Sequence, residues 1–414
     1  MQVLRWSTAQ QTGRRQDDRL RRLLLKIVQG AAHANPALVL TASIIGATYR
    51  YSLLWCVLIA APVLITLFSV SARIGSQTHR GLVDLLRSYY GRPTALLCAA
   101  VILVMNTAMI VANLMAVTDA FSILLQLPRM FFIAAAAFSV WYILIFRDYR
   151  GVARVMAVIA LPLFLYIGAA LLSKPPWTIV IRDSLMPSIA HEPHYMTAII
   201  AVLGSLFTPC VVAWQTRSRF NPHAITGPST PAEHRSGTLI TALLCFAIMI
   251  ASSTLAHIGS AGELTTRIAA EALAPSVGPL ATVLYALGII GAGMVALPFL
   301  VASMCFSVSE AMGWRSGFHE NPWEARRFYV LISVVVLVAG AVNFARINPV
   351  VVLYWSQILA GLLTVPILAF MLLISNNRQI MRTANTWWQN FWIGSGGSAI
   401  VLAGLLALCW KIIG

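Results

Sequence analysis

The stretch Ala34-Asn35-Pro36-Ala37-Leu38 interrupts an apolar segment that runs from about residue 23 to residue 48. Proline cannot donate a backbone hydrogen bond, and it disfavours helical geometry at the residue before it. A polar residue directly before a proline, in the middle of a segment of membrane-spanning length, predicts two half-helices that meet at an unwound point. Unwound backbone is tolerated at that depth only where it faces protein or a hydrated cavity.

A second break of the same kind lies in the second half of the chain, where residues 204–210 read Gly-Ser-Leu-Phe-Thr-Pro-Cys. Here Thr208 comes directly before Pro209. Two interrupted segments at corresponding places in two halves indicate the central site of a transporter. The alternative is that Pro36 and Pro209 are ordinary proline kinks, which membrane helices also contain.

The composition is that of an integral membrane protein with several spans. Hydrophobic residues make up 59% of the 414 residues and charged residues only 10%, whereas soluble proteins carry about 25% charged residues. The net charge of +16 does not indicate a nucleic-acid partner, because the basic residues lie almost entirely in the first 26 residues or between apolar runs. We expect residues 1–22 to form a basic cytoplasmic tail near anionic lipid, and residues 23–414 to form one transmembrane domain.

Eleven apolar runs approach or exceed the roughly 20 residues that a spanning helix needs. If the N-terminus is inside, the cytoplasmic segments hold 22 of the 29 basic residues and the outer segments hold 7. This asymmetry follows the positive-inside rule, and it predicts a cytoplasmic N-terminus and an outer C-terminus. The runs lie near residues 23–48, 52–72, 94–118, 129–146, 152–172, 196–216, 237–257, 278–305, 327–345, 349–374 and 392–413.

Three shorter features lie between or beside these runs. Residues 75–92 place leucines and a valine among charged residues, which predicts a short helix at the membrane surface. Residues 173–195 are expected to form an outer loop. Glu310 and Arg315, just past the eighth run, are expected to pair at a helix end.

Acidic residues are absent from the centres of all the predicted spans, although the chain has thirteen Asp and Glu residues. A cation pathway through lipid usually keeps a carboxylate in the bundle interior, so any mechanism must work without one. The six cysteines lie in apolar runs without Cys-x-x-Cys spacing, which indicates neither disulfides nor a zinc site. No nucleophile–base pair, phosphate loop or metal triad falls in one pocket. We therefore expect no enzyme activity and no cofactor.

Several stretches carry a family resemblance that covers about residues 31–405. Residues 42–55 look like the end of a first helix and the start of a second, and residues 71–75 with Gly81-Leu82 look like the end of that second helix. Residues 287–293 and 309–314 match an eighth helix, and Asn343-Phe344, residues 347–349 and residues 375–378 fit a ninth and tenth. In these stretches the chain resembles the NRAMP divalent-metal transporters, particularly their bacterial branch.

The resemblance implies an all-α integral membrane protein of the leucine-transporter type, in the inner membrane of a bacterium. Spans 1–5 and 6–10 would form a 5+5 inverted repeat, and an eleventh helix would be appended. Helices 1 and 6 would be discontinuous at the metal site, where the two proline breaks lie.

The resemblance also implies a set of site residues on the two broken helices. Helix 1 of the family supplies an Asp before the proline and, in many members, an Asn three residues later; this chain has Asn35 and Leu38 in those places. Helix 6 supplies a backbone carbonyl, a Met before the proline in classical members, and a His after it. The matching residues here are Ser205, Thr208 and Cys210.

Two further positions come from other helices. Gln357 matches a Gln that the family's helix 10 contributes, and Asn113 matches an Asp in the proton path of helix 3. His33 is the only titratable residue near the first break, and an imidazole can carry a proton at a pKa of about 6.5. The alternative for His33 is a hydrogen-bonded structural role.

The residues at these positions are neutral where the family has charged ones. Asn35, Thr208 and Gln357 are therefore the predicted metal-binding residues, with Ser205 and Cys210 as further candidates. A dehydrated divalent ion in a low dielectric is costly unless negative charge meets it, and hard cations prefer carboxylate oxygens. Cys210 could bind a soft metal as a thiolate, or it could simply pack.

Three functions remain open from the sequence. The first is transport of a divalent metal ion of the Mn, Mg or Fe class by alternating access, without proton coupling and with a partly hydrated ion. The second is transport of another small solute, anionic or zwitterionic, because half-helix N-termini without carboxylates favour negative groups. The third is a relative that does not transport and acts as a sensor or assembly partner. The expected partners are the lipid bilayer and the transported species, with no nucleic acid; the sequence does not specify an oligomeric state.

Overall fold

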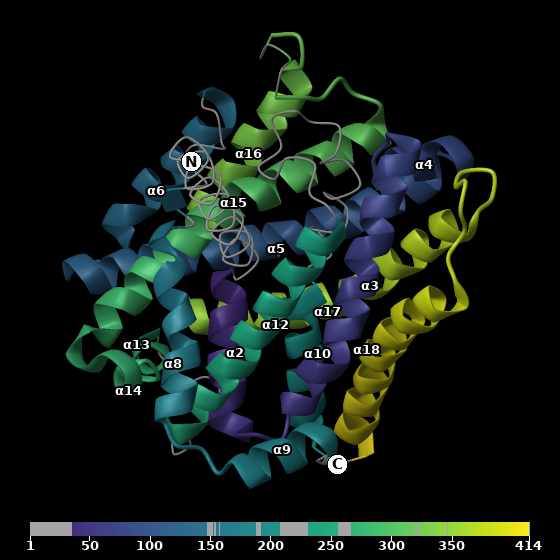
Figure 1. Cartoon of the computed structure of the whole chain (residues 1–414). Helices are drawn as coiled ribbons and strands as arrows, with labels where there is room; N and C mark the ends of the chain where they lie inside the picture. Colours follow the sequence, from purple (N-terminus) through teal and green to yellow (C-terminus); the bar gives the residue numbers. More distant parts are fainter. Residues whose placement is uncertain are drawn as a thin grey trace, which may run out of the picture.

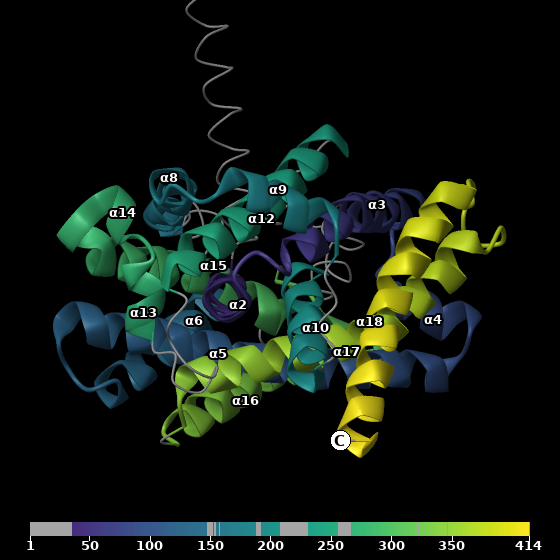
Figure 2. The same ribbon diagram turned by 90° about the horizontal axis from the view of Figure 1, so that it is seen from below.

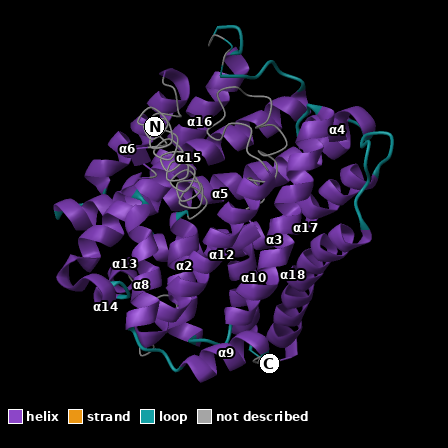
Figure 3. Cartoon of the chain, viewed as in Figure 1, coloured by secondary structure: helices purple, strands orange, loops and turns teal. Residues whose placement is uncertain are grey.

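The computed structural model describes residues 35–146, 152, 155, 156, 158–187, 192–207, 231–255, 266–318, 320, 323–345 and 347–413. All regular secondary structure in these ranges is helical, as Figure 3 shows. The expectation of an all-α protein is therefore confirmed.

Six helices are long and apolar enough to cross a membrane by themselves within the described ranges. They are α3 (Leu54–Thr78), α5 (Arg92–Leu125), α15 (Ala281–Met312) with the short helix before it, α16 (Arg326–Asn343), α17 (Pro349–Asn376) and α18 (Trp387–Ile413). Four shorter apolar helices are α2 (Pro36–Tyr49), α6 (Met130–Phe146), α10 (Pro193–Phe207) and α12 (Pro231–Ser252). Figure 1 shows how they gather into one bundle.

Each of the eleven apolar runs coincides with part of a helix. The run near residues 152–172 corresponds to η1 (Leu161–Phe164) and α8 (Leu165–Leu172). One of the short helices adjoins the first proline break, since α2 begins at Pro36. The described part of α10 reaches Phe207, and the second break at Thr208-Pro209 lies outside the described residues. The number of membrane crossings itself stays a prediction.

Small residues let the helices around α2 approach closely. Gly46 on α2 lies against the backbone of Met249 on α12, so a Cβ at position 46 would overlap it. Close backbone approach at glycine is the usual way that membrane helices associate. Helix α2 packs on α12, α10, α17 and α5, and it lies near the centre of the bundle when the molecule is viewed from below (Figure 2).

Residues 173–195, which were expected to form an outer loop, contain a helix that no sequence pattern predicted. Helix α9 (Trp177–Leu185) follows α8 at a bend of 112°, after Pro175 and Pro176 have ended α8. Its Val180 and Ser184 are buried one turn apart, and α9 packs on α3. Because only two residues of α9 are buried, the helix has no apolar pattern long enough to be recognised in the sequence.

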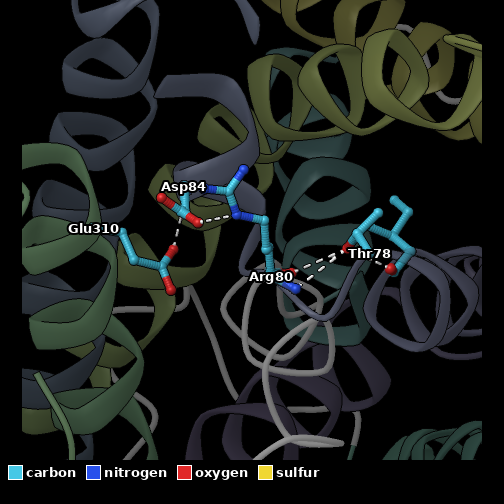
Figure 4. Close-up of polar contacts among 5 residues, drawn as sticks. Thr78, Arg80, Asp84 and Glu310 are labelled. Carbon is cyan, nitrogen blue, oxygen red and sulfur yellow. Dashed lines mark hydrogen bonds and ion pairs between the residues drawn. The ribbon is translucent and has the colours of Figure 1, made fainter. Parts of the chain in front are cut away.

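The predicted surface helix is present as α4 (Leu82–Tyr89), and it is anchored to α15 by Glu310. The Glu310 carboxylate accepts a hydrogen bond of 3.3 Å from the backbone N–H of Asp84, and it lies where a Cβ on the N-cap Gly81 would be. Asp84 also forms an ion pair of 2.9 Å with Arg80 (Figure 4). Negative charge at a helix N-terminus is stabilising, so these contacts hold α4 against the bundle. The pairing of Glu310 with Arg315 stays a prediction.

Candidate functional site

Asn35 caps the start of α2. Its backbone is extended, with φ −70° and ψ 158°, and its Oδ1 accepts a hydrogen bond of 2.7 Å from the N–H of Leu38. Pro36 occupies the first helical position, where its missing N–H costs no helical hydrogen bond. Asn35 is 4% exposed, so this helix start lies inside the protein and not at its surface.

Helices α10 and α17 cross at a pair of glycines. Gly204 lies against the backbone carbonyl of Gln357, and a Cβ on Gly361 would lie 2.6 Å from the backbone oxygen of Ile200. The neighbouring Ser205 is 2% exposed and donates a hydrogen bond of 2.8 Å to the Val202 carbonyl. The crossing therefore brings Ser205 and Gln357, two of the predicted site residues, to the same level of the bundle.

The Gln357 side chain is fully buried, and only one of its two polar atoms forms a hydrogen bond. Its Nε2 donates a hydrogen bond of 3.1 Å to the Ser356 hydroxyl, which in turn donates to the Leu353 carbonyl at 2.7 Å. Its Oε1 has no hydrogen-bond partner in the part of the chain that the structure describes. A buried amide oxygen without a donor has a free energy cost, so this oxygen is suited to a water molecule or a cation.

Asn113 lies on α5, near the start of α2. Gly293 on α15 lies between the two. A Cβ added to Gly293 would overlap the Val117 side chain on α5 and lie 3.3 Å from Cγ of Pro36. Asn113 precedes Val117 by four residues, which is about one helical turn. The Asn113 side chain is fully buried; its Nδ2 donates to the Met109 carbonyl at 2.7 Å, and its Oδ1 has no partner among the described residues.

Other buried polar side chains on α2 and α5 were not predicted as candidates from the sequence. On α2 itself, the Thr41 hydroxyl has no hydrogen-bond partner in the described ranges. Asn106 repeats the pattern of Asn113 seven residues earlier on the same face of α5, with Nδ2 donating to the Leu300 carbonyl at 3.2 Å and Oδ1 unpartnered. The seven-residue spacing of two asparagines in an apolar run was the signal that could have found Asn106.

The donor set that the structure describes is neutral. Within the described ranges, no group of three or more His, Cys, Asp or Glu side chains could hold a metal ion. Asn35, Ser205 and Gln357 offer amide, hydroxyl and carbonyl oxygens, which suit hard cations but supply no negative charge. His33, Thr208, Pro209 and Cys210 lie outside the described residues, so their part in the site stays a prediction.

A bundle of long apolar helices, with a further helix that starts at a buried proline, defines an integral membrane protein with several spans. Residues 26–410 match the family described as natural resistance-associated macrophage protein-like, and the chain belongs to this family. The family consists of transporters, which confirms the expectation that the chain is not an enzyme.

Similar proteins include divalent metal cation transporters named MntH. The one from Deinococcus radiodurans is 26% identical over 405 residues, covering 94% of this chain and 89% of the relative. The one from Granulibacter bethesdensis is 21% identical over 391 residues, covering 91% and 85%.

Two solved structures show the fold. The Eremococcus coleocola manganese transporter, in complex with an aromatic bis-isothiourea substituted compound, gives a TM-score of 0.65 at 16% identity, covering 93% of this chain and 84% of that one. MhsT in complex with L-phenylalanine gives a TM-score of 0.59 at 13% identity, covering 92% and 98%. The fold is thus shared by a metal transporter and by a protein that binds an amino acid.

Proposed function

We propose that the chain transports divalent metal ions across a bacterial inner membrane by alternating access, through a site made of neutral oxygens and without proton coupling. One observation carries the proposal of a cation. The buried carboxamides of Gln357 and Asn113 each donate their N–H to the protein and leave their oxygen without a partner among the described residues. Oxygens of this kind attract cations and water and give an anion nothing to bind.

The start of α2 also supports a cation over an anionic solute. A helix N-terminus binds anions through its free N–H groups, but here few are free. Pro36 has no N–H, the N–H of Leu38 is bound by the Asn35 side chain at 2.7 Å, and the N–H of Val39 donates to the Asn35 carbonyl at 3.3 Å. This leaves only the N–H of Ala37 in the first turn for another acceptor.

A site without carboxylates favours an ion that keeps part of its hydration shell. In a low dielectric, removing all water from a divalent ion would cost more free energy than its binding to neutral ligands would recover. Mg²⁺ dehydrates reluctantly and usually keeps several waters when bound. We therefore expect partly hydrated Mn²⁺ or Mg²⁺, bound by Asn35, Gln357 and Thr208, with Ser205 and Cys210 at the edge of the site.

The proposal that transport is not coupled to protons rests on position 113, where Asn113 has no titratable group. An amide does not change its protonation between about pH 5 and pH 8, the range in which biological switches usually work. His33 remains the one candidate for a proton near the first break.

The orientation follows from the distribution of basic residues. In this proposal the N-terminus, with its basic tail at residues 1–22, is cytoplasmic and the C-terminus lies outside. The end of the bundle with α4, the start of α5 and the end of α17 then faces the cytoplasm (Figure 1).

Flux measurements in proteoliposomes test the choice of substrate. Uptake of Mn²⁺ and Mg²⁺ is compared with uptake of small anionic and zwitterionic solutes, using the native chain and Asn35→Ala. Metal uptake that falls in the variant supports the proposal. Solute uptake without metal uptake would identify the second function, and the absence of any flux would favour the sensor or assembly role.

A further inference from the structure

A groove with a cavity volume of about 570 Å³ lies at the surface between the start of α5 and the last turns of α17. It is lined by Tyr90, Ala369, Leu372, Leu373, Asn376 and Asn377. This groove is separate from the candidate transport site, because it opens outward at one end of the bundle and none of the site residues lines it.

The groove changes from polar to apolar along α17. Asn376 and Asn377, at the end of α17, form the polar rim together with the Tyr90 hydroxyl. Ala369, Leu372 and Leu373 lie one to two turns deeper along the same helix. A helix that crosses the membrane therefore presents polar groups at headgroup level and an apolar surface at acyl-chain level, which is the order of groups along a phospholipid.

Two arginines lie next to residues of the polar rim in the sequence. Arg378 follows Asn377 directly in sequence, and Arg92 follows Tyr90 by two residues; both side chains are exposed. Positive charge beside a polar rim complements an anionic headgroup, and basic residues next to a membrane span attract anionic lipids.

Hydrogen bonds fix the shape of the rim. The Tyr90 hydroxyl donates to the Leu373 carbonyl at 3.2 Å, and the Asn377 Nδ2 donates to the Tyr90 hydroxyl at 3.2 Å. Asn376 and Asn390 on α18 exchange two hydrogen bonds of 3.0 Å. Because the lining is held in place by the protein itself, a ligand would not have to order it.

We propose that this groove binds one anionic phospholipid, with its headgroup between Arg92 and Arg378 and an acyl chain along Ala369, Leu372 and Leu373. The site goes beyond the proposed transport of metal ions and does not depend on it. A bound lipid would join the start of α5 to the hairpin between α17 and α18, two parts of the chain far apart in sequence.

Native mass spectrometry of the detergent-purified protein tests this site with phosphatidylglycerol and phosphatidylcholine as probes. We expect one phosphatidylglycerol to be retained more strongly than phosphatidylcholine. The double variant Arg92→Gln with Arg378→Gln is expected to weaken its retention about fivefold for each arginine removed. Arg50→Gln, at the exposed arginine that follows α2 and lies outside the groove, is the matched charge control and should retain the lipid.

A second pair of variants tests the apolar part of the groove. Ala369 and Leu362 are both exposed on α17 and lie seven residues apart on one face, but only Ala369 lines the groove. Ala369→Trp should fill the groove and displace the lipid, whereas Leu362→Trp should not. Equal retention of both lipids, or retention that neither the arginine pair nor Ala369→Trp reduces, would overturn the proposal.

Discussion

Gly204 on α10 lies so close to the backbone carbonyl of Gln357 on α17 that a Cβ atom at position 204 would overlap the carbonyl oxygen. This contact determines how near the two helices come, and hence where Ser205 and the Gln357 side chain lie relative to each other. The candidate transport site therefore depends on backbone packing as much as on its polar groups.

The first prediction follows from that contact. Gly204→Ala should force α10 and α17 apart and destabilise the protein by about 1–3 kcal/mol, with loss of metal uptake. Thermal unfolding in detergent and uptake in proteoliposomes measure the two effects. Gly394→Ala on α18 is the control, since a Cβ there meets nothing within 4 Å. If Gly204→Ala were as stable and active as Gly394→Ala, the close crossing would not matter.

The second prediction separates stability from transport at Gln357. Gln357→Leu removes an amide oxygen that has no partner in the described structure, and Ser356 keeps its bond to Leu353. The unfolding free energy should change by less than about 1.5 kcal/mol. Metal uptake should fall about tenfold, which corresponds to roughly 1.4 kcal/mol of binding free energy. Thr364→Val, at a buried threonine two turns further along α17, is the control. Equal uptake by both variants would show that Gln357 is not part of the site.

The third prediction separates two roles of Asn35. Asn35→Ser keeps an N-cap oxygen but shortens the side chain, so the helix should stay stable while metal uptake falls. Asn35→Ala loses the cap as well, at a cost of about 0.5–2 kcal/mol. Asn35→Asp keeps the cap and adds a negative charge, so divalent metal should bind more tightly by calorimetry. Metal binding that stays undetectable in Asn35→Asp would favour a chain that no longer transports.

The fourth prediction concerns Glu310 at the start of α4. Glu310→Ala removes the acceptor of the Asp84 N–H and the negative charge at the helix N-terminus, so α4 should lose about 1–3 kcal/mol of local stability. Hydrogen exchange across residues 82–89 reports this loss directly. Glu310→Gln should keep the hydrogen bond and lose only the charge, giving an intermediate effect. Equal protection of α4 in all three proteins would show that Glu310 does not anchor it.

Much of the fold was predictable because a membrane imposes a simple pattern. Spanning helices need long apolar runs, so each of the eleven runs coincides with helical residues in the structure. The start of α2 at Pro36 was predictable because proline acts locally on its own backbone. Helix α9 was not, because its buried face consists of only Val180 and Ser184, too few residues to form a periodic pattern.

The polar interior was harder to predict than the helices. The resemblance pointed to Asn35, Ser205, Asn113 and Gln357, but the sequence does not say whether a buried amide is satisfied by its neighbours. That depends on the tertiary structure: Asn106 and Asn113 direct their N–H groups to backbone carbonyls and leave their oxygens unpartnered among the described residues. Likewise, the contact of Gly204 with Gln357 joins residues 153 positions apart, a relationship that no local pattern contains.

The central claim is that a neutral site carries a divalent metal ion without protons, and one measurement tests it most directly. Proteoliposomes that contain a pH-sensitive dye are given external Mn²⁺, and metal uptake and internal pH are followed together. We predict that Mn²⁺ enters while the internal pH stays constant, at a rate that an imposed pH gradient does not change. Acidification of the interior in proportion to the Mn²⁺ taken up, or no Mn²⁺ uptake at all, would contradict the account.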